Sequence, residues 1–187
     1  MPDTVFRDHQ QGGRGKMSRY SDWRTGTKYP GEGIRPVMRS QMEAALLSLT
    51  VPDRPWRVRA GLAGERADVV AECQMMEPAR GKGKARRQLE RTFKFRIHLD
   101  GEHHEVRVCA DVREITRAGD PPRRIVERRT GSGPRTRVWS RLSHWEKDAT
   151  GRRHRIDTVD FDSNHMRDPL QKIVLSSGWT WRGTHLA

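Results

Sequence analysis

The feature that most constrains the fold is an alternation of apolar and polar residues on both sides of the Asp100-Gly101 pair. The alternating apolar positions are Phe93, Phe95, Ile97, Leu99, Val106 and Val108. A period of two places one face of each strand against a core, and Asp-Gly is typical of a two-residue hairpin turn. Counting outward from this turn predicts a β-hairpin in which Phe95 lies opposite Val106.

The rest of the chain predicts two helices and further strands. An apolar period of three to four residues that stops before Pro52 predicts a helix over about 36–50. A second helix is predicted near the C-terminus, with Asp168 as its N-cap, Pro169 at its first position and Gly178 as its terminator. Runs with a period of two predict strands at about 56–59, 67–76, 112–117, 123–129, 135–145 and 153–161.

The remaining segments complete the predicted architecture. Residues 1–35 are rich in glycine and scattered charge without a hydrophobic period, which predicts a disordered tail. The basic stretch 77–91 predicts a loop with a short helix at its distal end, and Trp179 and Trp181 predict a final strand packed on the sheet. We therefore predict a single α+β domain over 36–187. Its fold would be an antiparallel β-meander or partly closed barrel of about seven strands, with an N-terminal and a C-terminal helix.

Charge is the most unusual property of the composition, because 37 Lys and Arg stand against 24 Asp and Glu, for a net charge of +13. No apolar stretch approaches the roughly 20 residues that a membrane span needs. The first residues also lack the apolar centre of a signal peptide, so we expect a cytoplasmic location. Cys73 and Cys109 lie singly inside apolar runs, which favours buried thiols over a disulfide framework or a zinc site.

Three segments carry a resemblance to a known family. They are Asp168-Pro169-Leu170, the run from Ser177 to Gly183, and the run from Ala67 to Glu72. In these segments the chain resembles members of an uncharacterised bacterial family, over roughly 52–183, and the resemblance implies no functional residues because that family has no assigned activity. The order of many strands followed by an apolar helix is also similar to that of the tubby and LURP-one barrels. Those barrels wrap a central helix, and some bind anionic lipid headgroups.

Two arginine-rich segments are the strongest functional feature. Residues 80–96 carry eight Lys or Arg against one Glu, and residues 117–137 carry seven Arg against two acidic residues. If the fold brings them together, they form a positive field that attracts the phosphate backbone of a nucleic acid. The residues that we expect to contact it are Arg80, Lys82, Lys84, Arg86, Arg87, Arg91, Arg123, Arg124, Arg128 and Arg129. The alternative is a solvated surface whose charge reflects only a GC-rich genome.

Catalytic and metal motifs are not recognised, so we predict a non-enzymatic protein without metal or cofactor. The run at 81–84 lacks the glycine spacing and the Ser or Thr of a P-loop. His98 and His103 face each other in the predicted hairpin, but two imidazoles do not complete a metal site, and surface histidines are the simpler interpretation. Asp160 and Asp162 share a strand face, where pairing with arginine is simpler than acid-base chemistry.

Several classes of function stay open at this stage. The preferred hypothesis is a binding module whose Arg-rich loops contact an anionic polymer, RNA or DNA. The alternatives are a barrel-like binder of an anionic lipid headgroup or small ligand, and a structural or protein-interaction domain with background charge. A hydrolase built on the aspartates of 157–168 would require a divalent metal. An anionic membrane surface is less favoured as a partner than RNA or DNA, and the sequence names no protein partner.

Overall fold

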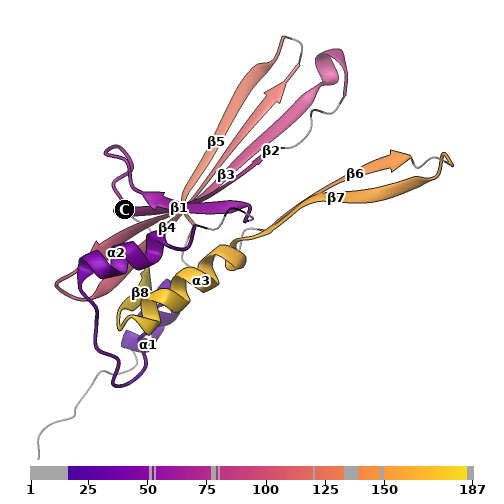
Figure 1. Ribbon diagram of the computed structural model, residues 1–187. Coiled ribbons are helices and arrows are strands. Elements are labelled where there is room, and N and C mark those ends of the chain that lie inside the picture. Colours follow the sequence, from indigo (N-terminus) through magenta and orange to yellow (C-terminus); the bar gives the residue numbers. More distant parts are fainter. Residues whose placement is uncertain are drawn as a thin grey trace, which may run out of the picture.

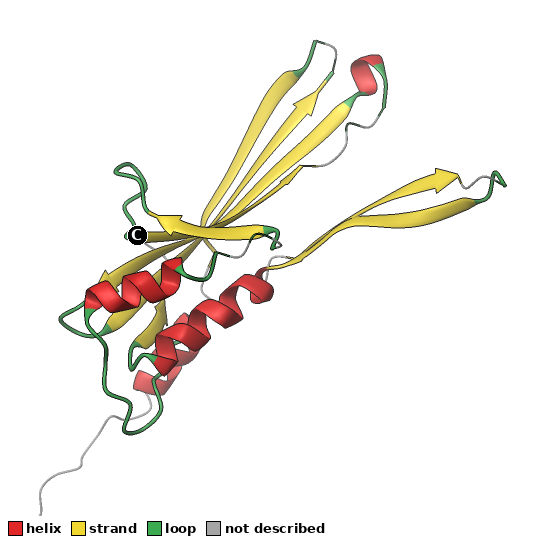
Figure 2. Cartoon of the chain, viewed as in Figure 1, coloured by secondary structure: helices red, strands yellow, loops and turns green. Residues whose placement is uncertain are grey.

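The computed structural model describes the backbone of residues 17–184, except 51, 53, 77–78, 80, 120, 133–138 and 148–149. Side chains are described from residue 21 on, except at those positions and over 128–132, 139–147 and 153–160. The fold is α+β, as predicted (Figure 2). Its elements are α1 (Met17–Thr25), α2 (Arg39–Leu47), β1 (Trp56–Ala60), β2 (Val69–Met76), a 3-10 turn η1 (Gly83–Ala85), β3 (Arg87–Asp100), β4 (Glu105–Ala118), β5 (Arg123–Ser132), β6 (Trp139–Lys147), β7 (Arg153–Asp162), α3 (Ser163–Ser176) and β8 (Thr180–Gly183).

The main sheet is an open, mixed sheet in the strand order β1-β2-β3-β4-β5, with β8 added beside β4 (Figure 1). The first five strands are antiparallel, and β3 lines one edge of β4 along its whole length. β5 and β8 therefore share the other edge of β4, and β8 runs parallel to it. The purely antiparallel prediction is wrong for β8, and the described strands do not close into a barrel. β6 and β7 form a separate two-stranded hairpin.

The hairpin predicted around Asp100 is confirmed, but its register is wrong. The loop has four residues, Gly101 to His104, and Phe95 lies opposite Ala110 instead of Val106. One physical reason is the Asp100 side chain, whose Oδ1 accepts a hydrogen bond from the backbone N–H of His103 at 3.1 Å and so stabilises the longer loop.

The corrected register also improves the charge pairing on the outer face of the sheet. The shift is an even number of residues, so the apolar side chains stay on the core face. Lys94 lies opposite Asp111 and not opposite Arg107, which removes the one like-charge pair of the predicted hairpin. His98 lies opposite Arg107 and not opposite His103, so the predicted pair of facing imidazoles is wrong.

The hydrophobic core lies between the sheet and the helices α2 and α3 (Figure 1). Its sheet side is formed by alternate residues of β1 to β4, and its helix side by buried residues such as Met42 of α2 and Leu170 of α3. The Phe93 ring lies 5.6 Å from that of Phe161, which connects the end of β7 to the sheet. Burial of apolar side chains, aliphatic and aromatic, is the main favourable contribution to stability.

The C-terminal helix is confirmed, but it begins earlier than predicted. Asp162, the last residue of β7, is the N-cap, and its Oδ1 accepts a hydrogen bond from the Asn164 backbone N–H at 2.9 Å. Asp168 and Pro169 therefore lie inside α3, not at its start. Gly178 ends the helix with φ of +78°, as predicted.

The structure also describes regular elements within two segments for which the sequence predicts a loop or a tail. Part of the predicted loop at 77–91 belongs to β3, which begins at Arg87 because this end of the strand pairs with the far end of β4. Within the segment predicted as a tail, the structure describes α1 and two backbone hydrogen bonds between Lys28 and Trp181, at 2.8 and 2.9 Å. The N-terminal segment thus contacts β8.

Candidate functional site

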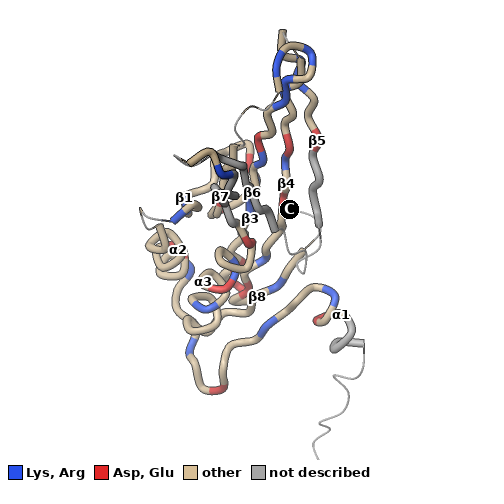
Figure 3. The backbone as a smooth tube through the Cα atoms, turned by 90° about the vertical axis from the view of Figure 1, so that its right-hand side faces the viewer, with Lys and Arg blue, Asp and Glu red and all other residues tan. Residues whose placement is uncertain are grey.

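The two arginine-rich segments meet at the end of the main sheet that points away from the helices (Figures 1 and 3). Arg87 of β3 pairs with Ala118 of β4, which pairs in turn with Arg123 of β5. The Gly119 backbone N–H donates to the Arg86 carbonyl at 2.8 Å. We call this region the basic tip and define it as Lys82, Lys84, Arg86, Arg87, Arg123 and Arg124.

All six side chains of the basic tip are exposed, and none has an ion pair within the part of the chain that the structure describes. The nearby Glu90 is already bonded to Arg117, 3.0 Å away, and to Gln74. The positive charge of the tip is therefore not neutralised by the described acidic groups. These six cations, in the segment before β3 and at the starts of β3 and β5, produce the local field that favours a polyanion.

The other predicted contact residues have different positions. Arg91 is partly buried and donates to Glu114 at 2.7 Å, so its charge supports the sheet and is not offered to a ligand. Arg80 lies outside the described residues. Arg128 and Arg129 belong to β5, with undescribed side chains.

β5 is the edge strand beside the tip, and it carries exposed apolar side chains at Ile125 and Val126, 55% and 46% exposed. Such an edge favours strand addition from another chain unless charged side chains oppose it. Arg123 and Arg124 have that protective effect whether or not they bind a ligand. Edge protection is thus the main structural alternative to a binding role for these two residues.

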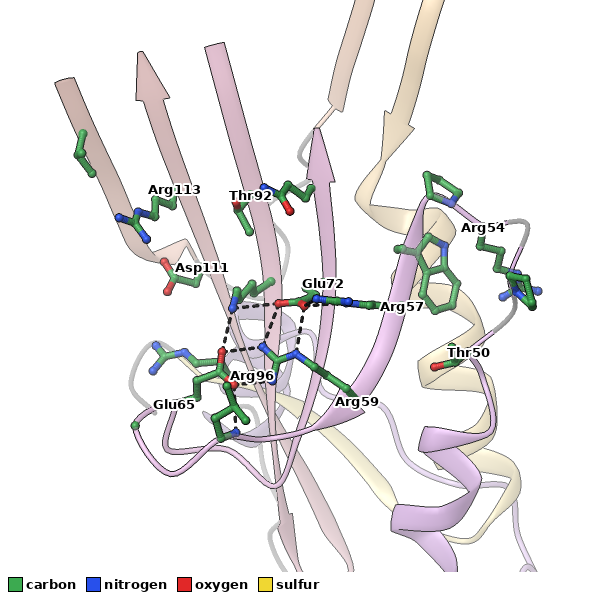
Figure 4. A pocket seen from close by; sticks show the side chains of 18 residues that line it. Thr50, Arg54, Arg57, Arg59, Glu65, Glu72, Thr92, Arg96, Asp111 and Arg113 are labelled. Carbon is green, nitrogen blue, oxygen red and sulfur yellow. Dashed lines mark hydrogen bonds and ion pairs between the residues drawn. The ribbon is translucent and has the colours of Figure 1, made fainter. Parts of the chain in front are cut away.

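A second site, which sequence analysis missed, is a groove of about 1200 Å³ on the outer face of the sheet (Figure 4). We call it the outer-face groove. Its charged lining residues are Arg54, Arg57, Arg59, Lys94, Arg96, Arg113, Glu65, Glu72 and Asp111. The signal was present in the sequence, because charged residues occupy alternate positions opposite the apolar ones in β1 to β4. It becomes a site only when the register places those positions side by side.

An ion-pair cluster forms the centre of the outer-face groove. Glu72, whose side chain is 10% exposed, accepts from Arg57 at 2.6 Å, from Arg59 at 3.0 Å and from Lys94 at 2.9 Å. Glu65 accepts from Arg59 at 2.6 Å and from Lys94 at 2.8 Å. Hydrogen bonds from Arg59 are the main cause that lowers the pKa of Glu72 to about 2 and holds the pKa of Glu65 far below its ordinary value.

The residues considered for metal or acid-base chemistry are dispersed. His98 is partly buried, which lowers its pKa, whereas His103 is exposed and bonded to Asp100 at 3.0 Å. Asp162 caps α3, and the side chain of Asp160 is not described. The described residues include no group of three or more His, Cys, Asp or Glu side chains placed to hold a metal ion.

Both cysteines are buried in the sheet. Burial raises the pKa of the Cys73 thiol to about 11, so this thiol is protonated at neutral pH and is a poor nucleophile.

Comparisons with protein-family models, curated proteins and solved structures found no match to this chain. The two resemblances seen in the sequence therefore stay predictions. Among the described residues, no helix is both long and apolar enough to cross a membrane.

Proposed function

We propose that the protein is a non-enzymatic binding module that holds RNA or DNA through the basic tip. The observation that supports this proposal is the convergence of two segments, 82–87 and 123–124, which the register of β3, β4 and β5 brings to one end of the sheet. Guanidinium groups match the geometry of phosphate oxygens and bind them with two parallel hydrogen bonds. The unneutralised charge then gains free energy by releasing counterions from the polymer.

The chemistry of the basic tip favours phosphates over bases. All six of its side chains are Lys or Arg, whereas proteins that stack single-stranded bases present exposed aromatic rings. Contacts to phosphate fix position but carry no sequence information. We therefore expect binding with little sequence preference and a strong dependence on salt.

Two alternatives are separated from this proposal by experiment. The lipid-headgroup alternative rested on an element order similar to that of a barrel. The described strands form an open sheet and not a closed barrel, so that similarity gives this alternative no support. A structural domain with background charge would use Arg123 and Arg124 only to protect the β5 edge. Any binding of a polyanion by such a domain would depend on the total charge of the protein and not on where the charges lie on its surface.

The test compares two variants with equal net charge. The tip variant carries Arg86→Gln, Arg87→Gln, Arg123→Gln and Arg124→Gln. The control variant carries Arg24→Gln, Lys28→Gln, Arg35→Gln and Arg66→Gln, four exposed sites outside the basic tip. Binding is measured by fluorescence anisotropy with labelled RNA, labelled duplex DNA and anionic vesicles.

The proposal predicts that the parent and the control variant bind the nucleic acid and that the tip variant binds it far more weakly. Equal affinities for the two variants would refute a role for the basic tip. Binding to vesicles alone would favour the lipid alternative.

A further inference from the structure

The outer-face groove contains more cations than its acidic groups can neutralise. Within the described residues, its lining has six Lys or Arg side chains and three acidic ones. Glu65 and Glu72 are both occupied by Arg59 and Lys94, and Glu72 also by Arg57. These ion pairs hold the centre of the groove in a fixed geometry. Both glutamates are thereby occupied, and the cations at the sides of the groove have no ion pair with either of them.

Two of the remaining cations, Arg96 and Arg113, have no acidic partner among the described residues. Arg96 Nη2 has only the weak acceptor Cys109 Sγ, 3.7 Å away, and Arg96 Nε is buried with no hydrogen-bond partner in that part of the chain. A buried donor left without an acceptor is energetically unfavourable. Arg113 is exposed and has no described ion pair. The buried Nε is out of reach of a ligand, but the Nη groups of Arg96 and the guanidinium of Arg113 line the groove and have donors available for an anion.

The register places these two arginines on opposite sides of the Lys94–Asp111 position of the sheet. Arg96 lies opposite Cys109, and Arg113 follows Cys109 on the same face of β4, so the two arginines start roughly 14 Å apart along the strands. The register partners Lys94 and Asp111 lie between them. Figure 4 shows Arg96 and Arg113 on the two sides of Asp111. An anion longer than one phosphate can contact both side chains.

The size and the borders of the groove indicate the class of ligand. Its volume of about 1200 Å³ exceeds what a single inorganic anion fills and suits an organic molecule. Exposed apolar side chains line it at Leu62 and Val126, 64% and 46% exposed, and could contact an uncharged part of the ligand. From these observations we propose that the outer-face groove binds a small anion with two or more linked phosphate groups, held between Arg96 and Arg113.

The proposal is tested by calorimetric titration of the full chain with tripolyphosphate, with adenosine triphosphate, and with sulfate at matched ionic strength. The first two ligands separate a bare chain of phosphates from one that carries an organic group. We expect saturable binding of at least one of them, and weaker binding of sulfate. Arg113→Gln should weaken the binding by about tenfold to a hundredfold, because it removes a charge-assisted contact.

Matched variants separate this site from the basic tip. Arg35→Gln, at another exposed site with no described ion pair, and the four-fold tip variant should both bind the oligophosphate as the parent does. Arg96→Gln should weaken binding as Arg113→Gln does, and circular dichroism checks that each variant is folded. The proposal is overturned if the parent binds neither phosphate ligand, if Arg113→Gln binds like Arg35→Gln, or if the tip variant loses binding to the same extent.

Discussion

Replacing Glu72 by Gln should destabilise the protein in a way that depends on pH. Three cationic side chains donate to this carboxylate, and its side chain is only 10% exposed. Its pKa falls from the ordinary 4.5 to about 2, which corresponds to roughly 3 kcal/mol at 1.36 kcal/mol per pKa unit. Arg57 is 68% exposed, so solvent screens part of this interaction. We therefore expect Glu72→Gln to lower the free energy of unfolding by about 2 kcal/mol at pH 7.

The sign of the pH dependence follows from the direction of the shift. Because the pKa of Glu72 is lower in the folded state, its carboxylate contributes fully above pH 4.5 and loses its contribution as the pH falls toward 2. The difference between parent and Glu72→Gln should thus shrink over that range. Urea unfolding at pH 7, 4 and 3 measures it, with Glu32→Gln, an exposed site, as control. A difference below about 0.5 kcal/mol at pH 7, or one that does not change with pH, would refute the argument.

Two further predictions concern the backbone and the buried thiols. Gly178→Ala should destabilise the protein more than Gly33→Ala in thermal unfolding, because both glycines have φ of +78° but only at Gly178 would the new Cβ lie 2.7 Å from backbone atoms of Arg35. Equal losses would show that this close contact is relieved at little cost. Cys73 and Cys109 should react with a thiol reagent only after unfolding, because both are buried, and fast labelling of the native protein at pH 8 would contradict the structure.

The strands were largely predictable from the sequence because their periods are local. Alternation in 93–108 and 67–76 indicates which face each strand buries, and the structure confirms a hairpin over the first segment and a strand, Val69–Met76, in the second. The register was not predictable from alternation alone, because a shift by an even number of residues keeps every apolar side chain on the core face. The hydrogen bond from the His103 backbone to Asp100, which stabilises the four-residue loop, is one contact that favours the observed register.

The final strand and the C-terminal helix were predicted, but the direction of one and the start of the other depend on contacts between distant parts of the chain. β8 adds to β4 in parallel, and only tertiary packing brings Trp181 beside Val106. The start of α3 was placed too late because Asp168-Pro169 is a good local cap signal, and the nearer cap, Asp162, is also the last residue of a strand. Local propensity could not rank these two caps.

The candidate sites were likewise predictable only where the signal is local in the sequence. The charge of the basic tip was visible in the sequence, but its convergence depends on the pairing of β3, β4 and β5. The outer-face groove combines residues from β1 to β5 and from the loop between β1 and β2, none of which forms a motif. Arg91 was predicted as a ligand contact because it belongs to a basic run, and its ion pair with Glu114 gives it a structural role.

The salt dependence of nucleic-acid binding tests the central claim most directly. If the four arginines of the tip variant contact phosphates, their neutralisation should reduce the slope of log K against log salt by about 3 to 4. The measurement is an anisotropy titration of the parent and the tip variant at several salt concentrations, with the equally charged control variant alongside. We predict a much shallower slope for the tip variant and an almost unchanged slope for the control. Equal slopes for the two variants would contradict the account, because the binding would then depend on total charge and not on the basic tip.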